Sequence, residues 1–147
     1  MKKYKLSLTE KQARIVQDAL ETHSRVLIGQ LEYVEEVWRW RTPFTEEKME
    51  KMEGMRQSLQ VAKGFIGQPP NGHFGIHNDA VSDDARKAYD IQQVMRYVSA
   101  WDREGKDPEN DERDWSEMMG VNFDTPRASS TDEEFGMPTM EVVEDGQ

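Results

Sequence analysis

Hydrophobic residues recur at helical spacing along the first part of the chain. From about residue 10 to residue 39 the apolar positions fall mostly three or four residues apart, which is the spacing of one helix face. These positions are Ala13, Val16, Leu20, Leu27, Leu31, Val34 and Trp38. Thr9 precedes the run, and Gln12 three residues later completes a capping box. Gly29 lies inside the run and is expected to bend or split the helix.

Two further helices are predicted, near residues 46–64 and 83–104. Pro43 ends the first run, and Thr45 and Ser82 stand where N-cap residues are preferred. The apolar stripe of the earlier helix is rich in methionine, which is typical of adaptable core filling. Its members are Met49, Met52, Met55, Leu59 and Ala62. The predicted buried face of the later helix comprises Ala88, Ile91, Met95, Val98 and Trp101.

Short apolar segments near both ends of the chain predict a small β element. Tyr4, Leu6 and Leu8 alternate with polar residues, as in a half-buried strand. Residues 121–123 and 138–144 give two more short runs, each too short to be stable alone. The predicted fold is therefore α+β and predominantly α-helical, with three helices and a small antiparallel β element that joins the N- and C-terminal segments.

The negative charge of the chain belongs to its C-terminal part. Residues 1–104 contain as many basic as acidic residues, so residues 105–147 carry the whole net charge of −10. We therefore predict a helical core for ligand binding and oligomerisation over 1–104, and an acidic, partly flexible segment over 105–147. No nucleic-acid partner is expected, because counterion release needs many clustered cations. The acidic segment is interpreted as a solvated tail, with a decoy that imitates nucleic acid as the alternative.

Length and composition exclude several classes of protein. A chain of 147 residues is typical of a single domain. The absence of cysteine excludes disulfide frameworks and thiol nucleophiles. No apolar run follows the first residues as in a signal peptide, and none is long enough to span a bilayer. We expect a soluble intracellular protein without a membrane partner.

Two acidic pairs could carry metal chemistry. Glu32 with Glu35, and Glu50 with Glu53, are spaced to share a helix face and could hold Mg²⁺ through oxygen ligands. All-helical nucleotide pyrophosphohydrolases use acidic pairs of this kind. The alternative is an ordinary solvated helix surface, which the frequency of glutamate on helices favours.

No other pattern in the chain indicates a catalytic centre. His73 and His77 are four residues apart, but Gly75 lies between them in a predicted loop, so the helical metal-site argument fails. There is no nucleophile elbow and no glycine-rich phosphate loop of the strand–helix type. These patterns therefore give no catalytic residue, no metal and no cofactor.

The candidate binding residues lie in a loop and beside the helical stripes. Residues 64–79 contain four glycines and two prolines, and long ordered loops in small domains are usually functional. Phe74 lies in this loop between Gly72 and Gly75. Arg25 and Arg96 lie within or beside apolar stripes, where a guanidinium needs an anion. That anion is either a helix glutamate or a bound phosphate.

Several stretches of the chain together resemble a family of small bacteriophage proteins, the first type of Thoeris anti-defence protein. The stretches are residues 19–30, 69–77, 88–102, 122–127 and 140–143. The resemblance covers most of the chain and contains no catalytic signature. Residues 110–119 depart from the family's pattern, which puts the role of the C-terminal segment in doubt.

The resemblance implies a function that composition does not. Members of this family are molecular sponges that act in the host cytoplasm. They bind cyclic ADP-ribose signals, notably the glycocyclic form made by TIR-domain defence enzymes, without degrading them. Captured signal cannot activate the downstream effector, so the family serves immune evasion. Members also bind cyclic oligonucleotides in separate pockets, and they assemble into homo-oligomers, which implies a dimer or hexamer here.

The resemblance also suggests roles for individual residues. Phe74 would stack on the base, while Arg25 and Arg96 would clamp phosphate oxygens. Asn71 and Asn78 would hydrogen-bond the base edge or the ribose hydroxyls. Arg56 completes the predicted ligand-binding set. The alternatives are a Mg²⁺-dependent pyrophosphohydrolase that uses the two glutamate pairs, and an acidic protein-interaction decoy that acts through residues 105–147.

Overall fold

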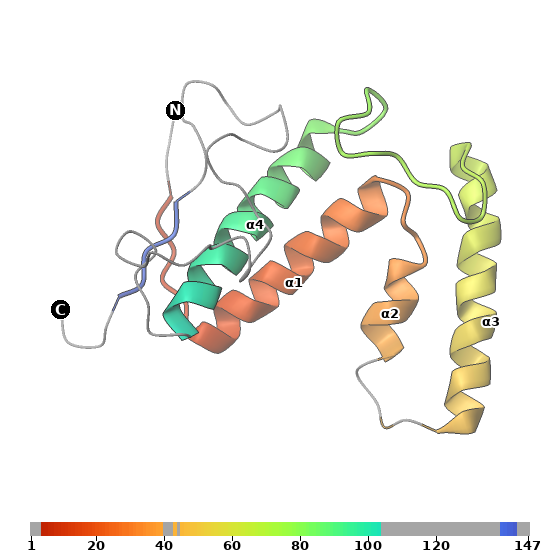
Figure 1. Ribbon diagram of the computed structural model, residues 1–147, viewed down its shortest axis with the longest axis horizontal. Coiled ribbons are helices and arrows are strands. Elements are labelled where there is room, and N and C mark those ends of the chain that lie inside the picture. Colours follow the sequence, from red (N-terminus) through yellow and green to blue (C-terminus); the bar gives the residue numbers. More distant parts are fainter. Residues whose placement is uncertain (1–3, 40–42, 44, 104–138, 144–147) are drawn as a thin grey trace.

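A computed structural model of the protein describes residues 4–39, 43, 45–103 and 139–143, which form helices and the loops that join or flank them (Figure 1). The helices follow one another in the order α1, α2, α3, η1 and α4, where η1 is a single 3-10 turn. Their bounds are α1 (Glu10–Leu27), α2 (Tyr33–Arg39), α3 (Glu46–Ala62), η1 (Lys63–Ile66) and α4 (Asp83–Arg103).

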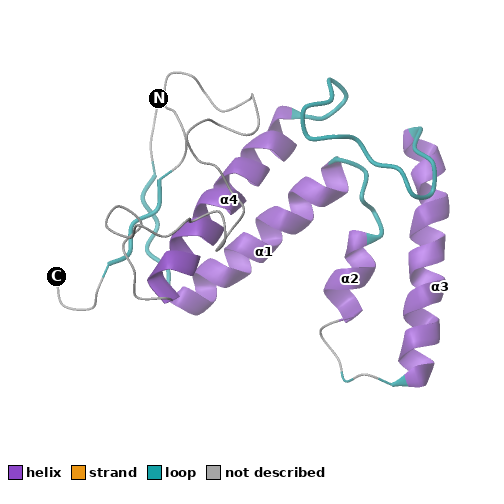
Figure 2. Ribbon diagram, in the orientation of Figure 1, coloured by secondary structure: helices purple, strands orange, loops and turns teal. Residues whose placement is uncertain are grey.

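The predicted β element is wrong for the part of the chain that the structure describes. Residues 4–8 and 139–143 are extended, but neither forms a strand (Figure 2). The two segments do approach one another, because Leu8 and Met140 line the same cavity. An alternating pattern predicts an extended, two-faced segment, whereas a strand also requires a hydrogen-bonded partner. The fold is therefore helical over the described residues, and the α+β class is corrected.

The first predicted helix is split at Gly29. The Thr9 capping box is confirmed, since its side chain accepts the Gln12 N–H and the Gln12 side chain accepts the Thr9 N–H. Gly29 has a φ of +88°, which an L side chain rarely adopts. The chain therefore leaves α1 at this glycine and begins α2 four residues later. Three predicted helices become four α-helices and η1 over the described residues.

The core lies between α1 and α4, which pack side by side and run in opposite directions (Figure 1). The buried apolar residues of this pair are small, which lets the two backbones approach closely. They include Ala13, Ala85, Ala88 and Ala100, joined by Val94 and Met95. The predicted face of α4 is confirmed at Ala88 and Met95, but Ile91 is 37% exposed. The Trp101 side chain lies outside the described part.

The helix α3 stands away from the hairpin of α1 and α4, whereas α2 contacts both α1 and α3 (Figure 1). The side chain of Thr45 accepts the N–H of Lys48, which confirms the predicted N-cap. No residue of α3 is buried, so the methionine stripe predicted as core is not covered within one chain. Met49 is exposed, and Met52 and Met55 are half-buried.

A long loop returns the chain from the end of α3 to the start of α4, and it contains the predicted binding segment. The loop follows η1 and ends at Ser82, whose hydroxyl accepts the Ala85 N–H as the predicted cap. The predicted strand at 121–123 and most of the acidic segment lie outside the described residues. In the part of the chain that the structure describes, no helix is long and apolar enough to cross a membrane.

Candidate functional site

The turn between α1 and α2 anchors the loop that carries Phe74. The Phe74 N–H donates to the carbonyl of Ile28 at 2.8 Å. A Cβ added to Gly29 would lie 3.2 Å from Ile66 Cδ1 and 3.7 Å from Phe74 Cδ2. The glycine therefore lets η1 and the phenyl ring lie against the backbone of the turn. Phe74 is half-buried in this position, with part of its surface open to solvent.

Arg25 is held at the same turn by several contacts. Its Nε and Nη2 atoms lie 2.9 and 2.8 Å from Glu21 Oε1, and its Nη1 donates to Gln30 Oε1 at 2.9 Å. The guanidinium carbon lies 4.6 Å from the centre of the Tyr33 ring, in cation–π geometry. Of the two anions considered for Arg25, the structure shows the helix glutamate. A guanidinium has more N–H donors than these contacts use, and the side chain remains 40% exposed.

Tyr33 presents its hydroxyl beside this arginine. Burial raises the pKa of Tyr33, and the nearby carboxylate of Glu21 raises it further against the opposing charge of Arg25. The hydroxyl therefore stays protonated at neutral pH and can donate a hydrogen bond. Sequence reasoning did not select Tyr33. The available signal was its position eight residues after Arg25, on the other side of the expected break at Gly29.

A buried ion pair lies where η1 meets the segment before α2. Lys63 is completely buried, and its Nζ atom donates to both carboxylate oxygens of Glu32 at 3.0 and 2.9 Å. Burial alone would raise the pKa of Glu32, but the hydrogen bond and charge of Lys63 outweigh it, so the pKa lies below its ordinary value. The carboxylate is therefore ionised at neutral pH, as its partner requires.

Arg56 faces a second buried carboxylate and not an open cleft. Glu35 is fully buried, and its Oε1 accepts the Arg39 Nε–H at 2.7 Å. Arg56 Nη1 lies 4.0 Å from Glu35 Oε2, an oxygen without a hydrogen bond among the described residues. In this structure Arg56 on α3 therefore offsets the charge of Glu35 on α2.

The two predicted asparagines have structural partners within the loop region. Asn71 Oδ1 accepts from Gln60 Nε2 at 3.1 Å, which ties the loop to α3. Asn78 Oδ1 accepts the Ala80 N–H at 2.9 Å and shapes the turn before α4. Arg86, which sequence reasoning did not select, donates to the carbonyls of Asn78 and Ile76. These bonds fix the end of the loop on α4.

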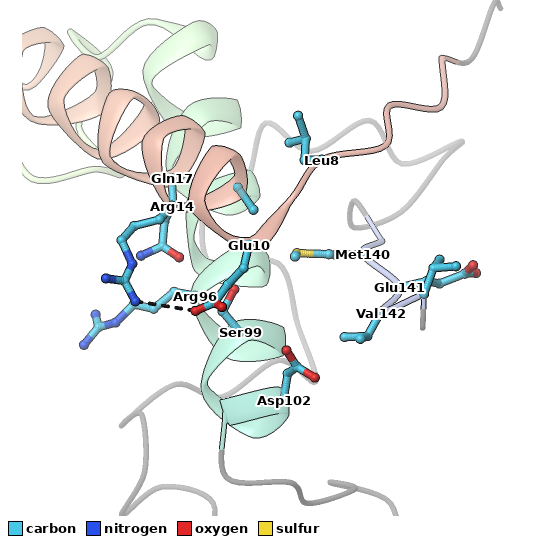
Figure 3. Close-up of a pocket in the computed structure, with 12 residues that line it drawn as sticks. Leu8, Glu10, Arg14, Gln17, Arg96, Ser99, Asp102, Met140, Glu141 and Val142 are labelled. Atoms are coloured by element: carbon cyan, nitrogen blue, oxygen red, sulfur yellow. Dashed lines mark ion pairs between the residues drawn. The ribbon is translucent and has the colours of Figure 1, made fainter. Parts of the chain in front are cut away.

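Arg96 lies in a different place from the other predicted residues. It is ten residues beyond Arg86 on α4, about 15 Å further along the helix at 1.5 Å per residue. There it lines a cavity of about 260 Å³ between the start of α1, the end of α4 and residues 139–143 (Figure 3). Arg96 is exposed and has no ion pair or hydrogen bond with any described residue. Arg14 in the same cavity pairs with Glu10 at 3.7 Å.

The four glutamates of the enzyme alternative differ in their surroundings. Glu32 and Glu35 are taken up by Lys63 and Arg39, while Glu50 and Glu53 are exposed on α3. Among the described residues, no three histidine or acidic side chains are grouped so that they could hold a metal ion. All three histidines, His23, His73 and His77, are exposed.

Comparisons with known proteins add nothing to this picture, since no family model, curated protein or solved structure matches the chain. Its own geometry divides the six predicted binding residues. Arg25 and Phe74 are brought to one turn, Asn71 and Asn78 lie on the loop that Phe74 belongs to, Arg56 lies across α2 and α3, and Arg96 stands apart. The turn that joins Phe74 and Arg25 is therefore the strongest candidate site.

Proposed function

We propose that the protein binds and sequesters a cyclic ADP-ribose signal, such as the glycocyclic form, without turning it over. The proposal follows from the resemblance to Thoeris anti-defence proteins. The observation that carries it is that Phe74 and Arg25 attach to the same turn between α1 and α2, Phe74 through Ile28 and Arg25 through Gln30. An aromatic ring and a guanidinium attached to one turn match the chemistry of a ligand that contains an adenine and a pyrophosphate.

Each side chain has a separate part in binding. The half-buried Phe74 ring offers a surface for stacking on the base, which is worth about 1–3 kcal/mol per base. Arg25 would give the pyrophosphate the N–H groups that Glu21 and Gln30 leave unused. The protonated hydroxyl of Tyr33 adds a neutral donor at the same turn. Because the turn and the loop are fixed by hydrogen bonds before the ligand arrives, little ordering cost accompanies binding.

Arg96 can reach the same ligand only from a second copy of the chain, since it lies well away from Phe74 along α4. A homo-oligomer is supported by the surface of one chain. The helix α3 has no buried residue, and Phe65 at its end is 93% exposed. We propose a dimer or hexamer on this ground, acting in the host cytoplasm. The cavity around Arg96 is the place to look for a separate cyclic oligonucleotide.

The test is capture and release of intact ligand. Purified protein is mixed with glycocyclic ADP-ribose and removed by filtration, and both the filtrate and the heated protein are assayed. Loss from the filtrate with recovery of intact ligand on heating supports a sponge. Conversion to a product would instead indicate an enzyme, and unchanged ligand in the filtrate would refute the proposal for this ligand.

A matched pair of variants tests the site. Phe74→Ala should weaken binding by at least about fivefold, which corresponds to the lower limit of about 1 kcal/mol for a lost stacking contact. Tyr4→Ala removes an aromatic ring from a position that is 91% exposed and lies outside α3 and η1, and it should leave affinity unchanged. Light scattering on both variants separates a change of assembly from a change of affinity. Equal affinity of the Phe74 variant and the unaltered protein would refute the assignment of Phe74.

A further inference from the structure

We infer that the buried ion pair of Lys63 and Glu32 is the positioning element of the binding loop: it holds the loop in place for Phe74 to meet the ligand. Neither residue has to touch the ligand. The effect on ligand binding rests on the proposed function, whereas the effect on the loop does not.

The first step of the argument is the place of Lys63 in the chain. Its side chain reaches Glu32, which precedes α2, while its backbone carbonyl accepts the Gln68 N–H at 3.0 Å. The same residue therefore fixes η1 on the connection between α1 and α2 and forms the turn that follows. The loop leaves this turn in a set direction.

The second step is that the loop is attached to the same connection again. The Phe74 N–H bonds to Ile28, four residues before Glu32. Between these two points lies Gly29, where an added Cβ would be 3.2 Å from Ile66 Cδ1 and 3.7 Å from Gln68 Cγ. Removal of one attachment leaves the segment between Gln68 and Phe74 held at one end and by the exposed hydrogen bond of Asn71 to Gln60 on α3. Such a segment opens more often, and its amides exchange faster.

The third step concerns charge. Lys63 is wholly covered and Glu32 is only 17% exposed, so neither charge is well solvated if the other is removed. A buried charge that loses its partner is strongly unfavourable, and the structure relieves it by opening toward water. We expect the opening to separate η1 from the connection, because α1 and α4 pack against each other and η1 contacts neither of them (Figure 1).

The experiment compares this pair with an exposed pair of the same residue types. Lys63→Met keeps the aliphatic stem and removes the charge, and Glu32→Gln is the second variant in case the first does not fold. Lys51 and Glu47 on α3 form the control, since they lie 2.6 Å apart but are 70% and 79% exposed. Lys51→Met therefore removes an equally short ion pair that is open to water.

Amide hydrogen exchange is measured on the full chain without ligand. In Lys63→Met or Glu32→Gln, exchange at Gln68 and Phe74 should rise by about tenfold or more, with the amides of α1 and α4 unchanged. Lys51→Met should change neither group. Unchanged exchange at Phe74 in a folded variant would overturn the inference. An equal rise throughout α1 and α4 would also overturn it, because the pair would then stabilise the whole fold.

Ligand binding distinguishes the inference from the proposed function. With glycocyclic ADP-ribose as probe, Lys63→Met should raise the dissociation rate by about tenfold, since the loop must be ordered again on each binding event. The charge-exchanged double variant Glu32→Lys/Lys63→Glu should restore part of the loss. If the unaltered protein does not bind the probe, the proposed function fails. The hydrogen-exchange result still shows whether the ion pair holds the loop in place. Binding that is unaffected in a variant with a faster-exchanging loop would refute the positioning role.

Discussion

Substitution of Gly29 by alanine tests how the turn supports the binding loop. At a φ of +88°, an L side chain destabilises the folded state by about 1–2 kcal/mol. Alanine also lowers the conformational entropy of the unfolded chain, which offsets about 0.5–1 kcal/mol of this loss. The new Cβ would also lie 3.2 Å from Ile66 Cδ1, so that side chain must shift by a few tenths of an ångström. We expect a total loss of about 1.5 kcal/mol in the free energy of unfolding.

Two other glycines separate these contributions. Gly67 has a φ of +73° with no atom within 4 Å of an added Cβ, so Gly67→Ala carries the backbone strain alone. Gly54 lies inside α3 with free space around it, and Gly54→Ala should stabilise the protein by about 0.5–1 kcal/mol. Urea unfolding followed by circular dichroism measures all three variants. The reasoning fails if Gly29→Ala costs no more than Gly67→Ala, or if Gly54→Ala destabilises the protein.

Three further predictions concern the polar contacts of the helices. Thr9→Ala removes the capping box of α1 and should lower the free energy of unfolding by about 1 kcal/mol in urea titrations; no loss would contradict the capping argument. Burial opposes the effect, but Lys63 keeps the folded-state pKa of Glu32 below its ordinary value of 4.5. The contribution of this ion pair to the free energy of unfolding is therefore complete above pH 4.5, and it is lost as the pH falls through the folded-state pKa. Lys63→Met should flatten this acid-side slope, and an unchanged slope would contradict the pairing. Arg39→Met leaves the buried Glu35 without its hydrogen bond and should cost about 2 kcal/mol, which replacement of both residues by methionine should largely restore.

The helices and their starts could be predicted from the sequence because their signals are local. The side chains of Thr9, Thr45 and Ser82 all accept the backbone N–H that their positions predict. The break at Gly29 was expected as a bend or a split, and the positive φ decides for the split. Patterns within a few residues contain this information, since capping and helix interruption depend on near neighbours.

The errors and omissions come from contacts between distant residues. The alternation at residues 4–8 is real, but whether an extended segment becomes a strand depends on a partner far away in the sequence. Lys63 carried no sign of burial, because its partner Glu32 lies 31 residues earlier. Arg25 and Phe74 were both selected as candidates, yet nothing in the sequence showed that one turn holds both. The separation of Arg96 from Phe74 became clear only from the structure, where Arg96 lies far along α4 and Phe74 lies on the loop before this helix.

The pairing of α1 with α4 also has a consequence for synthesis of the protein. The two helices form the core, but α2, α3 and the long loop are made between them (Figure 1). At roughly 5–20 residues per second, α1 leaves the ribosome several seconds before its partner is complete. During that interval its apolar face, including Val16 and Leu20, is uncovered. The α1 face therefore stays exposed to solvent in the nascent chain until α4 emerges and packs against it.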